Sequence, residues 1–282
     1  MPLFFFIAGM TLRRYDDYTQ FTVNKINRIF IPYLFFSILW TLFDFFILLP
    51  VGSDGPLWFL PTMFASLLFC QTLFRLKNQY ITNAVIVVCV LITYIINHLN
   101  VALFPFDLDR MLRAVPYIYA GFVFCQSHFK EVILNVNKYK SAGWLIVLTC
   151  LYFACLYLML SKGMILEGEG FMRGEPYGKS LIIVYVASFS AILATIVFSY
   201  MVRHLRLVNW LGKNSLVVLC IHYPFTQYWN TIISSTGLYE SGGGRIVCAI
   251  ISYIIIIGFC IPGIYLCKHY IPKLTGYDAI LK

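Results

Sequence analysis

Long apolar stretches alternate with short polar ones along the whole chain. After an opening run at residues 1–10, eight further apolar runs follow at residues 31–49, 57–74, 81–96, 111–126, 143–160, 181–201, 216–229 and 246–267. A helix needs about 20 apolar residues to cross a bilayer, and most of these runs approach that length. They lack the in–out alternation of barrel strands, so they predict transmembrane helices.

The opening run, MPLFFFIAGM, is about half as long as a transmembrane helix. Its positive charges, Arg13 and Arg14, follow the apolar residues, whereas a secretory signal carries them in front. We therefore expect a half-span, as though an earlier helix preceded it. The expected fold class is all-α: a polytopic transmembrane helix bundle of about eight full spans plus an N-terminal half-span, forming one domain over residues 1–282.

Composition agrees with a membrane protein. Hydrophobic residues make up 60% of the chain and charged residues 12%, against about 25% charged residues in typical soluble domains. The net charge of +9 comes from short basic clusters between apolar runs and forms no continuous basic face, so it does not favour nucleic-acid binding. The nine cysteines never occur at CxxC spacing, and no metal-ligand cluster is visible, so we expect no metal site.

The distribution of positive charge predicts the orientation in the membrane. Most of the 21 lysines and arginines follow the first, third, fifth and seventh apolar segments or lie in the C-terminal tail. By the positive-inside rule these loops are cytoplasmic. We expect a multi-pass protein of the cell membrane whose chain starts outside and whose C-terminus is cytoplasmic.

Histidine suits acyl or proton transfer because its pKa lies near neutrality. Among the five histidines, His222 is distinctive: it follows Lys213, at the predicted cytoplasmic boundary, by nine residues, which places it roughly 13 Å deep in the membrane. An ionisable group at that depth is a functional candidate, and the alternative is a histidine that only bonds a neighbouring helix. Asn214 or Ser215 is expected to cap its helix, and Pro224 to break it.

Four other residues are candidates for substrate binding. Asp44 lies inside the run at residues 31–49, where a carboxylate needs a partner or a water-filled pocket. Arg110 and Arg113 share a helix face, and together with nearby aspartates they form either an anion site or a closed salt-bridge cluster. Trp58 lies between two prolines, and its position alone favours a role as an anchor at the membrane interface. Basic clusters on the inner side suit the phosphates of a donor such as coenzyme A, although the positive-inside rule already explains them.

Four stretches together carry a family resemblance. MPLFFFIAGM, KINRIFIPYLFFS (25–37), GPLWFLPTMF (55–64) and WLGKNSLVVLCIHYPF (210–225) resemble, in order and spacing, the membrane acyltransferase 3 family, and most closely its fucose 4-O-acetylase-like branch. RAVPYIYAG (113–121) resembles a fifth stretch of that family. Members of this branch carry a complete helix before the first stretch, so the resemblance implies that this chain lacks the first transmembrane helix and its catalytic histidine.

The resemblance implies an integral membrane enzyme that transfers an acyl group, usually acetyl from cytoplasmic acetyl-CoA, to a hydroxyl of a surface or extracellular carbohydrate. His222, Trp58 and Arg113 match the family's motif positions. On this basis we expect His222 to be catalytic, Asn214 and Ser215 to lie at the donor end, and Trp58, Arg110, Arg113 and Asp44 to bind substrate. The expected partners are the bilayer, acyl-CoA, the carbohydrate acceptor and glycan-assembly proteins.

Two other classes of function stay open at this point. A saccharide or glycolipid transporter or flippase would use the same midplane polar groups for binding without chemistry. A non-catalytic truncated remnant would follow from the missing helix.

Overall fold

The computed structural model describes residues 1–13, 17–47, 55–99, 108–127, 138–161, 181–234 and 242–281. Its helical elements are α1 (Pro2–Met10), α2 (Tyr18–Lys25), the π-helix η1 (Ile26–Phe30), α3 (Ile31–Ile47), the 3-10 helix η2 (Pro56–Trp58), α4 (Phe59–Arg75), α5 (Gln79–Leu99), α6 (Leu108–Gln126), α8 (Lys138–Ser161), α9 (Leu181–Met201), α10 (Arg206–Lys213), α11 (Ser215–Ser234) and α12 (Gly242–Tyr270). The described part contains no strand, which confirms the all-α fold.

Each of the eight apolar runs after the opening one corresponds to a long helix, and α9 begins and ends at the predicted residues. Five helices of the described part are long and apolar enough to cross a membrane: Pro56–Arg75, Gln79–Ile96, Lys140–Ser161, Leu181–Met201 and Val247–Tyr270. These confirm a membrane helix bundle, while the total of about eight spans stays a prediction. The short helices α2 and α10 were not expected from the pattern.

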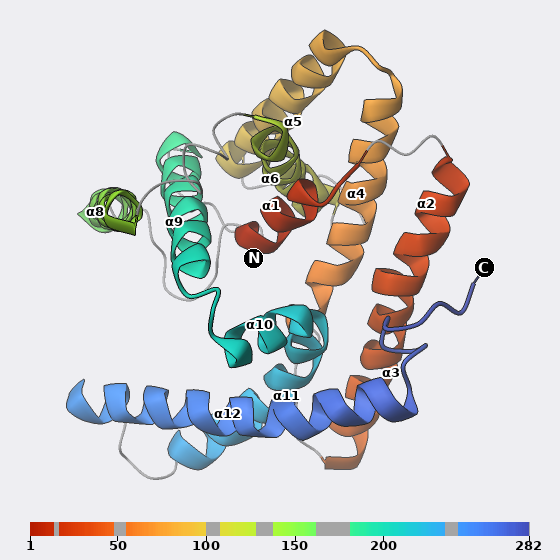
Figure 1. The fold of residues 1–282 in the computed structure, drawn as a ribbon, viewed down its shortest axis with the longest axis vertical. Coiled ribbons are helices and arrows are strands. Elements are labelled where there is room, and N and C mark those ends of the chain that lie inside the picture. The colour runs from red at the N-terminus through yellow and green to blue at the C-terminus, as the bar shows by residue number, and fades with distance from the viewer. Residues whose placement is uncertain are drawn as a thin grey trace. The chain divides into compact units, whose positions relative to one another are not determined.

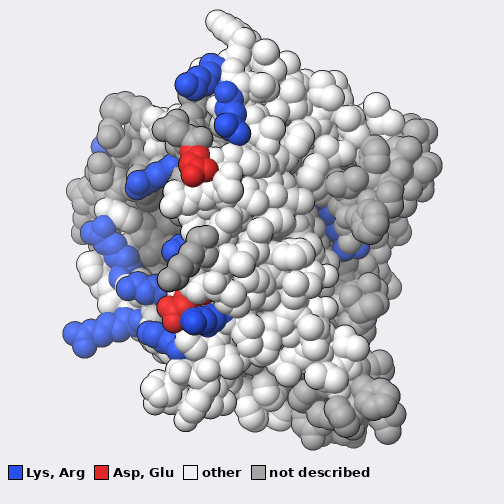
Figure 2. Space-filling view, turned by 90° about the vertical axis from the view of Figure 1, so that its right-hand side faces the viewer, with Lys and Arg blue, Asp and Glu red and all other residues white. Residues whose placement is uncertain are grey.

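The surface agrees with insertion into lipid. Charged side chains occupy little of the face drawn in Figure 2, most of which is white. Large apolar side chains stand exposed along the candidate spans, such as Ile146 on α8 and Ile254 on α12. Lipid tails are as apolar as these side chains, so the exposure has no hydrophobic cost inside a bilayer.

The chain divides into two compact units. Unit 1 comprises Met1–Tyr18 and Ala65–Arg206, and unit 2 comprises Thr19–Phe64 and Leu207–Lys282. Each unit therefore combines segments that are far apart in the sequence. That the whole chain forms a single domain stays a prediction.

In unit 1, α1 packs against α6 and α9, α5 packs on α6, and α8 lies beside α9 (Figure 1). At two glycines the backbones of α1 and α6 touch directly. A Cβ added at Gly9 would overlap the carbonyl oxygen of Ile118, and one at Gly121 would overlap that of Phe6. Small residues allow such close approach, which is a main source of helix association in membranes. Helix α1 is therefore built into unit 1.

In unit 2, α11 packs on α12, and η2 contacts both α11 and α3. The rings of Phe225 and Phe259 stack with centroids 4.8 Å apart, and Trp229 Nε1 donates a hydrogen bond of 2.7 Å to Ser252 Oγ. A stacked aromatic pair and an interhelical hydrogen bond hold α11 against α12. Since α11 carries His222, this packing positions the candidate catalytic group.

Candidate functional site

The helix that carries His222 does not end at Pro224. α11 continues through Pro224 to Ser234, so the expected break is wrong. Proline has no N–H, which leaves the carbonyl of the residue four positions earlier without its helical donor. That residue is Cys220, and its carbonyl accepts a hydrogen bond of 3.1 Å from Trp40 Nε1 of α3. The helix continues because another element supplies the missing donor.

The imidazole of His222 is partly buried and has one defined hydrogen bond. Its Nδ1 lies 2.9 Å from the carbonyl oxygen of Val218. A carbonyl oxygen can only accept, so Nδ1 carries the proton, and in the neutral ring Nε2 keeps its lone pair. Within the described part of the chain no partner of Nε2 is found. The ring is therefore held in the tautomer in which Nε2 can accept a proton.

An aromatic stack lies directly beside His222. The rings of Trp40 and Tyr223 have centroids 5.3 Å apart and are nearly parallel, at 15°. Gly55 packs against both rings, because a Cβ there would overlap the Trp40 ring and lie 2.8 Å from Tyr223 Cε1. The stretch GPLWFLPTMF thus begins next to the histidine-bearing stretch.

Trp58 lies in the same unit as His222. It ends η2, is partly buried, and belongs to an element that contacts α11. The ring of Phe64, at the end of its stretch, lies 5.3 Å from that of Phe30 in η1. Three of the stretches named in the sequence therefore meet within unit 2.

Asn214 lies between α10 and α11, and both ends of its carboxamide are bonded within the protein. Its Nδ2 donates to the carbonyl of Trp210 at 2.7 Å, and its Oδ1 accepts from the Tyr277 hydroxyl. The side chain therefore turns back to α10 and to the tail, where a cap of α11 was expected. Asn214 joins three segments beside Ser215.

The C-terminal segment, residues 271–281, is tied to η1. Asn27 Nδ2 donates to the carbonyl of Leu281 at 2.8 Å, and Asn27 Oδ1 accepts from the backbone N–H groups of Ile280 (3.0 Å) and Leu281 (2.9 Å). Asn27 is only 2% exposed, and the tail provides partners for both ends of its amide.

A glycine allows the tail to approach so closely. Gly276 has φ +80°, which other residues rarely adopt. A Cβ there would lie 3.0 Å from Pro32 Cγ and 3.1 Å from the Arg28 carbonyl oxygen. The tail is therefore fitted against η1 and the start of α3.

Two cations, Lys25 and Arg28, lie where α2 continues into η1. Burial lowers the pKa of Lys25, and the nearby charge of Arg28 lowers it further. The Lys25 ammonium lies 5.3 Å from the centre of the Phe21 ring. A bound anion would relieve the repulsion between these two cations.

In unit 1, Arg113 is buried within α6. It is 1% exposed, and its Nη2 lies 3.5 Å from Asp109 Oδ2. The pairing with an aspartate that the sequence suggested is therefore present. Tyr117, one turn further along the same face, packs its ring 5.4 Å from that of Tyr185 on α9. A buried arginine in this setting is a candidate to hold polar substrate groups, and Arg110 lies partly buried next to this cluster.

Other sequence candidates are outside the described side chains. Asp44 lies in α3, but its side chain is not among those described, nor is that of His98; Asp107 lies outside the described residues altogether. Among the described residues no group of histidine, cysteine or acidic side chains is arranged to hold a metal ion. That the whole chain has no metal site stays a prediction.

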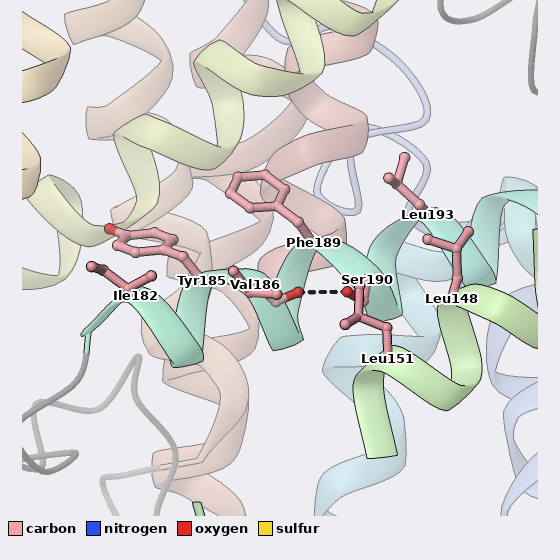
Figure 3. A pocket seen from close by; sticks show the side chains of 8 residues that line it. All are labelled: Leu148, Leu151, Ile182, Tyr185, Val186, Phe189, Ser190 and Leu193. Carbon is pink, nitrogen blue, oxygen red and sulfur yellow. Dashed lines mark hydrogen bonds between the residues drawn. The ribbon is translucent and has the colours of Figure 1, made fainter. Parts of the chain in front are cut away.

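An open groove of about 400 Å³ lies between α8 and α9. Figure 3 shows that it is lined by Tyr185, Phe189 and aliphatic side chains of both helices. The hydroxyl of Ser190 donates to the Val186 carbonyl of its own helix at 2.7 Å. The groove therefore suits hydrocarbon better than a sugar.

A second cavity of about 560 Å³ lies where α1 and α6 end, with Thr11, Arg13 and Gln126 among its lining residues. Its wall mixes polar and apolar groups. Neither this cavity nor the groove contains His222, Asn214 or Trp58.

Comparison with models of protein families shows to which family the chain belongs. A family model described as an acyltransferase domain matches residues 1–268, which is nearly the whole chain. The chain belongs to the acyltransferase 3 family. No curated protein and no solved structure is significantly similar to it. The match covers the stretches of both units and ends before residues 271–281, so Asn27 and Asn214 hold a segment beyond the matched region.

Three residues of the site were missed in the sequence. Trp40, Asn27 and Tyr277 each bind a partner far away in the chain. Only Pro224 gave a signal, because a proline inside an apolar run predicts a carbonyl that needs a donor. The sequence does not indicate which residue provides it.

Proposed function

We propose that this acyltransferase is an O-acyltransferase of the fucose 4-O-acetylase-like branch that transfers acetyl from acetyl-CoA to a hydroxyl of a cell-surface or extracellular carbohydrate. The observation that carries the proposal is His222: its imidazole lies partly buried on α11, and its Nδ1 donates to the Val218 carbonyl, which leaves Nε2 as a base. The family supports acyl transfer in general, and esterification of a hydroxyl requires a base of this kind.

In the proposed reaction Nε2 of His222 takes the proton of the acceptor hydroxyl. The hydroxyl oxygen attacks the thioester carbonyl, the C–S bond breaks, and the coenzyme A thiolate leaves. The proton returns from the imidazole to the thiolate, so the products are the O-acetyl sugar and free coenzyme A. Donors near the carbonyl would stabilise the negative charge that develops on its oxygen.

The remaining residues are proposed to bind the two substrates. Lys25 and Arg28 suit the donor phosphates, because an anion would offset the repulsion that helps to lower the Lys25 pKa. Ser215 is assigned to the donor end, with Asn214 holding its helix start in place. This end would face the cytoplasm, where acyl-CoA is found.

In unit 2, Trp58 and Asp44 are assigned to the acceptor. In unit 1, Arg110 and Arg113 are proposed separately to bind polar groups of a glycan. Trp58 belongs to an element that contacts α11, and an indole face suits the apolar side of a sugar ring. Arginines can donate several hydrogen bonds to hydroxyl or anionic groups of a glycan. We place the protein in the cell membrane with its C-terminus in the cytoplasm. Glycan-assembly proteins would act as partners on the opposite, acceptor side.

The test is an acetyl-transfer assay on membranes from cells that express the complete reading frame. Radiolabelled acetyl-CoA is supplied, and labelled carbohydrate is measured. We expect His222→Ala and His222→Gln to reduce labelling at least 100-fold, since general-base catalysis contributes about 10²- to 10⁴-fold. His204→Gln, at an exposed turn, is the matched control and should stay near the wild-type rate.

Two results would contradict the proposal. Unchanged labelling in the His222 variants would remove that residue from the chemistry. Flux of a saccharide across sealed vesicles without any need for acetyl-CoA would indicate transport instead.

A further inference from the structure

The hydrogen-bond ladder of α11 has one gap close to the candidate base. Pro224 has no N–H, so the Cys220 carbonyl lacks the donor that every other helical residue would provide. Cys220 is 0% exposed, so bulk water cannot replace that donor. The carbonyl needs a side chain from another element.

Trp40 of α3 provides that donor and a second contact. Its indole N–H bonds the Cys220 carbonyl at 3.1 Å, and its ring stacks on Tyr223 with centroids 5.3 Å apart. Trp40 is itself 7% exposed and lies against Gly55, so its position is well determined. Trp40 thus contacts Cys220 and Tyr223, which lie before and after His222 in the chain.

The His222 ring depends on this turn. Its Nδ1 bonds the Val218 carbonyl, and the Thr226 hydroxyl donates to the His222 carbonyl at 2.8 Å. Both bonds keep their geometry only while the helix between Val218 and Thr226 keeps its path. The tautomer with a free Nε2 lone pair is therefore linked to the path of α11 at the proline.

We propose that Trp40 is a positioning residue for His222: its indole N–H replaces the donor missing at Pro224 and fixes the turn that aims Nε2. The inference rests on the proposed function only in the part of its test that measures enzyme activity. Trp40 does not need to contact either substrate. Its loss should lower kcat by about 10- to 100-fold, because small displacements of reacting groups have effects of that size. The KM for acetyl-CoA should stay within about twofold.

The decisive experiment is a double-mutant cycle. Trp40→Phe keeps an aromatic ring for the stack on Tyr223 and removes the N–H. Pro224→Ala gives the chain back a backbone N–H at position 224 for the Cys220 carbonyl. If the indole acts through that carbonyl, Trp40→Phe should lower kcat strongly in the wild-type background and by less than threefold in the Pro224→Ala background.

Trp144→Phe is the matched control, since Trp144 lies on α8 in the other unit and is partly exposed. It should leave kcat unchanged. All variants are compared at equal amounts of folded protein, measured by size-exclusion chromatography in detergent. An equal loss of kcat from Trp40→Phe in both backgrounds would overturn the inference, because the Cys220 carbonyl would then not be the link.

A readout independent of activity separates this inference from the proposed function. In protein labelled with ¹⁵N-histidine, wild type should show the His222 Nδ1–H tautomer, and Trp40→Phe should shift it toward a mixture of tautomers. Pro224→Ala should reverse the shift. A shift without any acyl transfer would support positioning and contradict the function. Acyl transfer with identical ¹⁵N spectra and equal kcat in wild type and Trp40→Phe would overturn the positioning role alone.

Discussion

Two interhelical contacts, one in each unit, accommodate a missing backbone or side-chain group in opposite ways. Between α1 and α6, the missing group is a Cβ, and each glycine faces a backbone carbonyl of the other helix. Between α3 and α11, the missing group is an amide N–H, and Trp40 supplies a replacement. The first contact needs the space to stay empty, whereas the second needs it to be filled by one particular side chain.

This difference separates packing from positioning. At α1–α6 almost any added atom must displace a backbone, so the contact tolerates little variation. At α3–α11 the change of a single side chain alters the surroundings of His222 without touching it. We expect the glycine contact to determine whether unit 1 forms, and the polar contacts of unit 2 to determine how its site is arranged.

The largest effect is expected from Gly121→Ala. The added Cβ would overlap the Phe6 carbonyl, and because that atom is backbone, α1 has to move away from α6. We expect a loss of about 3 kcal/mol in stability, at the upper end of overpacking effects. Thermal unfolding in detergent measures it. Gly143→Ala, where nothing lies within 4 Å of the new Cβ, is the control and should be neutral or stabilising. Equal unfolding temperatures for the two variants would contradict the close approach.

Next in size is Asn27→Ala. The tail loses three hydrogen bonds to one buried amide, and we expect residues 271–281 to be released at a cost of about 1 to 3 kcal/mol. Hydrogen exchange of the tail amides measures the release. Asn78→Ala is the control, because Asn78 Oδ1 likewise accepts two backbone N–H groups, at the start of α5. It should leave tail exchange unchanged. Protection of the tail that survives Asn27→Ala would show that Asn27 does not hold it.

A smaller effect is expected from Gly276→Ala. Alanine at φ +80° costs about 1 to 2 kcal/mol, and its Cβ would press on Pro32 and on the Arg28 carbonyl. Limited proteolysis of the tail should become faster. Gly212→Ala, where the Cβ meets open space, provides the comparison and should not change cleavage. Faster cleavage in both would point to a general loosening of unit 2.

The smallest effect is expected from Tyr277→Phe, which removes one hydrogen bond to Asn214 at a cost of about 0.5 to 1.5 kcal/mol. Burial raises the pKa of Tyr277, so the folded state favours the protonated phenol. The stability that this group contributes is complete below the ordinary tyrosine pKa of about 10 and is lost as the pH rises through the raised value. Tail exchange measured up to pH 11 should rise more steeply in wild type than in Tyr277→Phe.

Tyr253→Phe, at an exposed position on α12, should follow the wild-type pH dependence. If Tyr277→Phe follows it as well, the Tyr277 hydroxyl does not contribute to holding the tail.

The helices could be predicted well because in this chain one variable, the run of apolar residues, decides where they lie. The bounds of α9 agree with the predicted run at residues 181–201, and α11, Ser215–Ser234, extends the predicted run at residues 216–229 at both ends. The short helices α2 and α10 were missed because they are polar and too short for an apolar run. His222 could be singled out as a candidate because it is an ionisable residue in an apolar segment, and its role stays a prediction.

The positioning contacts could not be predicted, and the reason is physical. Pro224 ends a helix unless another element donates to the freed carbonyl, and that outcome depends on tertiary structure. Asn214 has the right residue type for a cap, yet Trp210 and Tyr277 compete successfully for its two ends. Trp40 looks in the sequence like any other aromatic residue of an apolar run.

The glycine contact between α1 and α6 also has a genetic consequence. A clash between two side chains can be suppressed by making the partner smaller, but the partner of Gly9 and of Gly121 is a main-chain carbonyl. No substitution shrinks a main chain, and no residue is smaller than glycine. A selection for revertants of either glycine should therefore yield true reversions or changes that stabilise the protein elsewhere, and no compensating change at the facing position.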